Sequence, residues 1–209
     1  MDNAREYIKS HQSELLQEYN SILFKRAWEK YAKGNISYWE MESLCFYYHP
    51  HELININYDL YGLVDFDNLH YDSEVDYYFK RGGRDIPIYK LYKIIGTVIG
   101  KDDTRTSISL LTPDNKVVTV KFTKDYYAKY ARQLSEKQED GTKKVVEKSW
   151  FTRGTKVMCT GYRREDSFIT KTYKNTPTHQ LYKITKINED GTLEMTNERY
   201  NVQGEEVYE

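Results

Sequence analysis

Short β-branched segments separated by turns follow Pro87, and they restrict the possible folds more than any other part of the chain. They cover residues 92–99, 106–111, 117–122, 156–162, 168–173 and 180–187. Polar and apolar residues alternate in them: Val118 and Val120 alternate with Thr119 and Lys121. Such alternation is typical of a sheet with one buried face. The pattern predicts an antiparallel meander followed by further strands, with the other face open to a ligand.

A helical segment interrupts this series after its third strand. Thr123 or Asp125 can cap a helix that runs to about Leu134. Residues 136–150 are polar and contain the turn signal Asp140-Gly141, which predicts an inserted hairpin. The order β-β-β-α-β-β predicts an OB-fold, a five-stranded barrel with a helix between strands 3 and 4. SH3-like barrels and open β-sandwiches have similar strand spacing and remain alternatives.

The first part of the chain has a helical period and then loses it. Apolar residues recur on one face of residues 4–33, which predicts a long helix that Gly34-Asn35 ends. Ser37 and Glu40 form a capping box for a second helix. The buried side of this helix is predicted to carry Met41, Leu44, Cys45 and Tyr48. Residues 51–89 are irregular, acidic and aromatic, so we expect a connecting segment there.

These patterns together predict an α+β protein. Residues 1–89 are expected to form the helices and the connecting segment, residues 90–187 the OB-fold domain with its hairpin insertion, and residues 188–209 an acidic hairpin and tail. No apolar run approaches the ~20 residues that cross a bilayer, and no signal peptide is visible, so we expect a cytoplasmic protein without a membrane partner. Cys45 and Cys159 are far apart and are predicted to be reduced, packed thiols.

Charge is distributed unevenly along the chain. Residues 1–80 hold 7 lysines and arginines against 14 acidic residues, and residues 188–209 hold 1 against 7. Residues 81–187 hold 23 against 11. A basic centre between acidic flanks is typical of a module that binds a polyanion, although a lysine-rich solvated surface would give the same counts.

OB-folds bind single-stranded nucleic acid with a cationic groove and with aromatic side chains that stack on bases. The first three predicted strands and the loops after strands one and four carry such residues. The predicted nucleic-acid-binding residues are Lys93, Lys101, Arg105, Lys116, Lys121, Arg163, Arg164, Lys171, Tyr173 and Lys174.

Other candidate motifs do not indicate catalysis or a cofactor. His49 and His51 flank a proline and lack a third nearby metal ligand. The acidic residues between positions 65 and 76 lack the spacing of a calcium loop, so a solvated linker is predicted. Residues 80–84 lack the Gly-Lys-Ser/Thr of a phosphate-binding loop and are predicted to be a turn. We therefore predict no catalytic residue, no cofactor and no metal site.

Residues 39–53 resemble a helical segment of the bacterial DNA polymerase III alpha subunit, a C-family polymerase. The matching residues are Glu40, Glu42, Leu44, Phe46, Tyr47, His49 and Pro50. Cys45 stands where the family has glycine, and one residue is missing before His49. Further on, residues 94–99, 118–127 and 154–161 resemble the first strand, the third strand with its helix, and the fourth strand of the family's OB domain.

The resemblance covers residues 36–187. It implies a C-terminal piece of a bacterial or phage-like polymerase, consisting of the helix before the OB domain and the OB domain itself. The carboxylates that hold two Mg²⁺ ions in family members have no counterpart here. This piece is therefore not expected to act as an enzyme by itself, whereas its parent chain would be a DNA-directed DNA polymerase, a nucleotidyltransferase.

The resemblance implies a noncatalytic module that binds single-stranded template DNA during DNA replication. Its expected partners are single-stranded DNA, upstream polymerase domains and other replisome subunits. Two alternatives remain open. One is a protein–protein adaptor of the replisome, and the other is a small metal-dependent nuclease that uses the carboxylates of residues 65–76.

Overall fold

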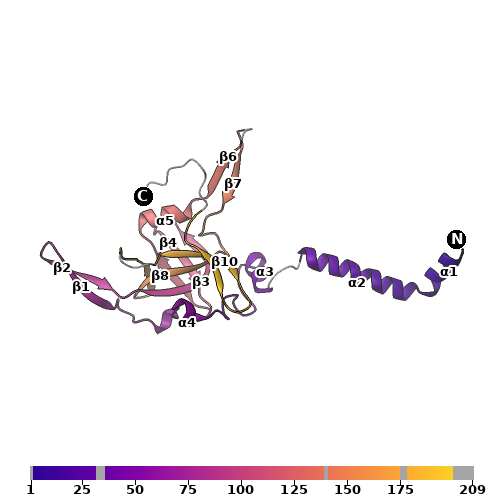
Figure 1. The fold of residues 1–209 in the computed structure, drawn as a ribbon, viewed down its shortest axis with the longest axis horizontal. Coiled ribbons are helices and arrows are strands. Elements are labelled where there is room, and N and C mark those ends of the chain that lie inside the picture. The colour runs from indigo at the N-terminus through magenta and orange to yellow at the C-terminus, as the bar shows by residue number, and fades with distance from the viewer. Residues whose placement is uncertain (1, 32–35, 139–140, 175–177, 200–209) are drawn as a thin grey trace.

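The computed structural model describes residues 2–31, 36–138, 141–174 and 178–199 (Figure 1). Its helices are α1 (Asp2–Ser10), α2 (Gln12–Tyr31), α3 (Ile36–Ser43), α4 (Tyr58–Tyr61), the 3-10 helix η1 (Phe66–Asn68) and α5 (Lys124–Ala131). Its strands are β1 (Val75–Arg81), β2 (Arg84–Tyr89), β3 (Tyr92–Asp102), β4 (Ser107–Leu111), β5 (Val117–Lys121), β6 (Leu134–Lys137), β7 (Lys143–Glu147), β8 (Lys156–Arg164), β9 (Ser167–Thr170), β10 (Leu181–Ile187) and β11 (Leu193–Thr196). None of the helices described is long and apolar enough to span a membrane.

Five strands close into a barrel. Around the ring, β3 pairs with β4, β4 with β5, β5 with β9, β9 with β8, and β8 with β3. Only the β5–β9 pair in this ring is parallel. Helix α5 lies between β5 and β8, the third and fourth of these five strands in chain order. This arrangement is consistent with an OB-fold and confirms the predicted α+β class. Strands β10 and β11 extend the sheet beside β8, and β6 and β7 form the inserted hairpin.

The barrel interior is filled by apolar residues from all five strands, among them Val118 and Val120, which the alternation predicted to be buried. These include Ile94, Val98, Ile108, Leu110, Val118, Val120, Val157, Cys159 and Phe168. Aromatic rings continue this core beneath α5, where Tyr130 lies 4.7 Å from Trp150 and Tyr127 lies 5.1 Å from Phe151 between ring centroids. Because aromatic side chains bury a large area each, this cluster anchors α5 to the barrel.

A second apolar cluster covers the outer face of β3 and β8. It consists of Leu53, Ile56, Leu63, Ile95, Met158 and Ile184. The first three come from the predicted connecting segment at residues 51–89, so this segment also packs against the barrel. That segment contains α4, η1 and the β1–β2 hairpin.

Buried polar contacts hold the same segment to the sheet. The Glu52 carboxylate lies 2.9 Å from the Lys156 ammonium and accepts a 3.0 Å hydrogen bond from the Tyr47 hydroxyl. His51 is buried beside them, and its Nδ1 accepts a hydrogen bond from the Leu53 N–H at 3.0 Å. Burial lowers the pKa of His51 to about 4, so the imidazole is neutral at pH 7.

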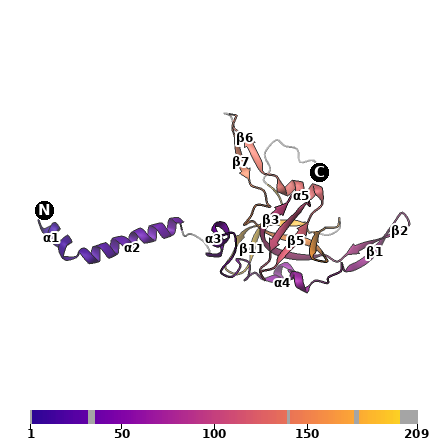
Figure 2. The same ribbon diagram turned by 180° about the vertical axis from the view of Figure 1, so that it is seen from behind.

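The N-terminal helices differ from the prediction. Residues 4–33 do not form a single helix, because His11 separates α1 from α2. Most large apolar side chains of α2 are exposed, namely Leu16, Tyr19, Ile22, Leu23, Phe24 and Trp28. In both views α1 and α2 extend away from the barrel, on the side opposite the β1–β2 hairpin (Figure 1 and Figure 2). The predicted end of residues 4–33 at Gly34-Asn35 lies outside the described residues.

Helix α3 is shorter than predicted. It ends at Ser43, and only Met41 of the four residues assigned to its buried side is buried; Leu44, Cys45 and Tyr48 are exposed. Cys45 has a φ of 67°, in the left-handed region that ends helices and favours glycine. The prediction of a packed thiol is confirmed for Cys159, which is buried, and wrong for Cys45.

The closure of the barrel depends on Gly161, which pairs with Tyr92 on one side and Thr170 on the other. A Cβ at this position would lie 2.0 Å from the Ile169 carbonyl oxygen. We expect Gly161→Ala to lower the free energy of unfolding in urea by about 3 kcal/mol, because the backbone of β9 must move. The control is Gly100→Ala, whose Cβ would meet only Ser109 at 3.9 Å. Equal stability of the two variants would contradict this account of closure.

Candidate nucleic-acid interface

Strand pairing places two of the predicted cations on one outer surface of the barrel. Lys121 of β5 pairs with Ile169 of β9, which pairs with Tyr162 of β8. Directly paired residues point to the same side of a sheet, and Arg164 lies two residues beyond Tyr162, again on that side. Phe168, on the opposite side of β9, is completely buried in the barrel. Lys121, Tyr162 and Arg164 therefore share an outer face.

Two more tyrosines join this face from elsewhere in the chain. The Tyr89 ring lies 4.4 Å from the Tyr162 ring, and the Tyr173 hydroxyl accepts a 2.8 Å hydrogen bond from the Tyr89 N–H. The Lys171 ammonium lies 5.9 Å from the Tyr173 ring centroid. Burial raises the pKa of Tyr162, with Arg164 opposing the shift, so its hydroxyl is protonated at neutral pH. We call Tyr89, Tyr162, Tyr173, Lys121, Arg164 and Lys171 the tyrosine patch.

The tyrosine patch combines the two groups that a single nucleic-acid strand requires. Its three tyrosines are partly exposed, and its three cations are exposed. Within the described ranges, no ion pair involves Lys121, Arg164 or Lys171. Stacked bases and neutralised phosphates account for most non-specific binding of single strands. The arrangement can therefore hold such a strand without reading its sequence.

Other predicted residues lie apart from the tyrosine patch. The Lys93 ammonium donates to the Tyr61 carbonyl oxygen at 3.1 Å, and Lys116 forms an ion pair with Asp67 of the segment before the barrel. Lys101 and Arg105 lie at the end of β3 and in the β3–β4 loop, where Asp103 and Asp102 lie 3.1 Å and 3.7 Å from them. Lys174 is exposed, and the residues that follow it are outside the described part of the chain.

Arg163 is engaged inside the protein. Its Nη1 donates to the carbonyl oxygens of Phe66 and Leu69, both at 3.1 Å, and its Nε donates to that of Glu165 at 2.8 Å. The guanidinium also lies 4.4 Å from the Phe66 ring centroid. Arg163 thus joins η1 to β8, whereas the neighbouring Arg164 is exposed and forms no ion pair with the residues that the structure describes.

The acidic residues between positions 65 and 76 do not gather at one point. Asp67 binds Lys116, and Glu74 accepts hydrogen bonds from Tyr92 and Lys90. Among the residues described, no three His, Cys, Asp or Glu side chains form a group that could hold a metal ion. Two of these carboxylates, those of Asp67 and Glu74, therefore attach the segment to the barrel, whereas Asp72 and Asp76 are exposed as predicted for a solvated linker.

Sequence reasoning missed Tyr89 and Tyr162, because each is an ordinary strand residue until the fold brings them together. It also missed the β1–β2 hairpin, which carries further exposed aromatic and basic side chains. A signal for the hairpin was available. Gly82-Gly83 between two β-forming segments is a typical two-residue hairpin turn.

The two neighbouring arginines should respond differently to substitution. We expect Arg163→Ala to lower the free energy of unfolding by about 2–3 kcal/mol, because it leaves partly buried carbonyl groups without their charged donor. Arg164→Ala should change it by less than about 0.5 kcal/mol, as is usual at exposed positions. Unfolding in urea measures the free energy of unfolding of both variants. Equal effects of the two substitutions would show that Arg163 does not join η1 to β8.

Two curated proteins match almost the whole chain. One is the "Probable DNA polymerase YorL" of Bacillus subtilis (strain 168), and the other is the "DNA-directed DNA polymerase" of Bacillus phage SPbeta. Each is 37% identical over 203 residues, which cover 97% of this chain and 15% of the relative. No protein-family model and no solved structure matches. The chain is therefore homologous to a region of these DNA polymerases and spans about 15% of their length.

Proposed function

We propose that this chain is the single-stranded DNA-binding OB module of a replicative DNA polymerase, with residues 90–187 as the OB domain. It would hold the template strand through sequence-independent contacts during DNA replication. Chemistry would reside in other parts of the polymerase, a DNA-directed nucleotidyltransferase of the polymerase III alpha type. Single-stranded DNA and neighbouring polymerase domains would be its partners.

The tyrosine patch is the observation that carries this proposal. Three cations without an ion pair among the described residues flank three tyrosine rings on a closed barrel. The matching proteins are named as DNA polymerases, so a nucleic-acid strand is the polyanion that best fits both the patch and the relatives. Base stacking contributes about 1–3 kcal/mol per base and does not depend on sequence.

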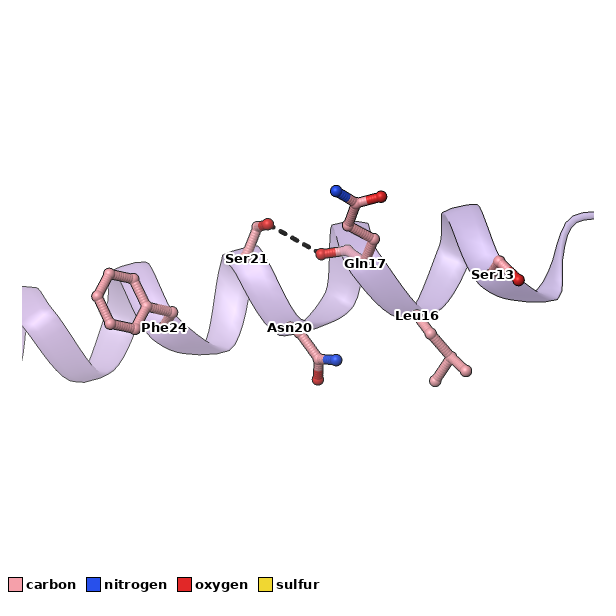
Figure 3. A pocket seen from close by; sticks show the side chains of 6 residues that line it. All are labelled: Ser13, Leu16, Gln17, Asn20, Ser21 and Phe24. Atoms are coloured by element: carbon pink, nitrogen blue, oxygen red, sulfur yellow. Dashed lines mark hydrogen bonds between the residues drawn. The ribbon is translucent and has the colours of Figure 1, made fainter.

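A second function, docking onto another part of a polymerase, is favoured by α2. Its side chains Leu16, Leu23 and Phe24 are 52%, 42% and 67% exposed. The hollow on this helix is lined by residues of α2 itself, so it lies along an open helix surface (Figure 3). Large apolar side chains exposed together on one helix are typical of an interaction site. Other domains of the same polymerase are the proposed partner.

Binding of fluorescein-labelled oligo-dT, followed by anisotropy over a range of salt concentrations, tests the first function. We expect the triple substitution Lys121→Ser, Arg164→Ser and Lys171→Ser to weaken binding. The slope of log affinity against log salt should flatten by about 2, since each neutralised phosphate of a single strand contributes about 0.7.

The matched control removes three charges from the β6–β7 hairpin, through Lys137→Ser, Lys143→Ser and Lys144→Ser. These lysines are exposed and lie outside the tyrosine patch. The control variant should keep most of its affinity for oligo-dT and most of the slope of log affinity against log salt. If both triple variants lose the same amount, binding follows net charge and the patch is not the site.

Docking through α2 is tested by mixing the chain with SPbeta DNA polymerase that lacks the matching region. Light scattering should show a complex, and Leu16→Ser with Leu23→Ser should weaken it at least tenfold, because the two leucines lie on one face of the helix. The control Glu18→Ala changes an exposed polar side chain of α2 that does not line the hollow, and it should leave the complex intact. Absence of any complex with the unaltered chain would exclude this function.

A further inference from the structure

The β1–β2 hairpin has a defined geometry although it lies outside the barrel sheet. Its turn residues Gly82 and Gly83 have φ values of 58° and 77°, as a type I′ turn requires. The two strands pair with each other, and no other described strand pairs with them. In both views the hairpin projects from the barrel (Figure 1 and Figure 2). An isolated two-stranded hairpin is only marginally stable in water, so a partner would stabilise it.

One face of this hairpin carries aromatic and apolar side chains, followed by two arginines next to the turn. The cross-strand pairs on this face are Tyr77 with Ile88, Phe79 with Ile86, and Arg81 with Arg84. Tyr77 and Phe79 are 56% and 53% exposed. Rings held this openly on a strand are available to stack on the bases of a single strand.

Arg81 and Arg84 lie directly opposite each other at the end of this face, next to the turn. Like charges in opposite positions destabilise a sheet. No carboxylate forms an ion pair with either arginine in the described part of the chain, whereas Lys80, on the other face, lies opposite Asp85. Two forked guanidinium groups side by side form a suitable site for a phosphate.

The base of the hairpin is joined to the tyrosine patch. Tyr89, the last residue of β2, contacts both Tyr162 and Tyr173. At about 3.3 Å per residue, the arginine pair lies roughly 17 Å along the hairpin from this contact. A strand that leaves the tyrosine patch can therefore follow the aromatic face to the arginine pair.

We propose that the β1–β2 hairpin is a second contact for the DNA strand held by the tyrosine patch. Tyr77 and Phe79 stack on bases, and Arg81 with Arg84 binds a backbone phosphate. The inference rests on the proposed function and adds an extension of the binding site beyond the barrel. It makes the hairpin important for long strands only.

Oligonucleotides of two lengths test this inference on the full chain. Labelled dT3 spans roughly 10 Å at about 3.4 Å per nucleotide, so it cannot join the tyrosine patch to the arginine pair, whereas dT20 reaches the hairpin. We expect Arg81→Ser with Arg84→Ser to weaken dT20 binding about tenfold in an anisotropy titration and to change dT3 binding less than twofold. Tyr77→Ser with Phe79→Ser should also weaken the binding of the long oligonucleotide and not of the short one. Because this variant removes no charge, a loss of charge would not explain the result.

Lys137→Ser with Lys143→Ser is the matched control, since these lysines also lie directly opposite each other on a hairpin. It should leave the binding of both oligonucleotides unchanged. Unchanged dT20 binding by the arginine variant, with dT3 still bound, would overturn the hairpin contact and leave the tyrosine patch intact. If the unaltered chain binds neither oligonucleotide, the proposed function fails, and the hairpin contact fails with it. An equal loss of dT20 affinity in the lysine control would also overturn the hairpin contact.

Discussion

The closure of β8 against its neighbours is the constraint on which the rest of the structure depends. Near Gly161 this strand pairs with β3 on one edge and β9 on the other, and the Ile169 carbonyl approaches so closely that no side chain fits there. The closure creates the interior that the β-branched residues fill. It also sets β9 between β5 and β8, which brings Lys121, Tyr162 and Arg164 onto one outer face.

The chain before the barrel determines which cations remain available on the surface. Residues 51–63 bury the outer face of β3 and β8, and η1 receives the Arg163 guanidinium. Lys93 and Lys116 are likewise engaged with this segment. The same packing positions the β1–β2 hairpin, because the chain leaves η1 beside the end of β8 and returns through Tyr89 to the tyrosine patch.

Much of the barrel could be predicted from the sequence, because alternation of apolar and polar residues follows directly from one buried and one exposed face. The β1–β2 hairpin could not be predicted in this way, since both of its faces are largely exposed and Tyr77, Tyr78 and Phe79 are consecutive aromatic residues. Arg163 and Arg164 are indistinguishable in the sequence. Only the fold shows that carbonyl groups almost a hundred residues away bind the first and leave the second exposed.

The central claim is that the tyrosine patch is where this module holds a single DNA strand. Amide chemical-shift mapping by NMR, with oligo-dT added to the isotope-labelled chain, tests it most directly. The largest changes should fall at Tyr89, Tyr162 and Tyr173 and along β9. Changes confined to the β6–β7 hairpin or to α2, with none at the three tyrosines, would contradict the claim.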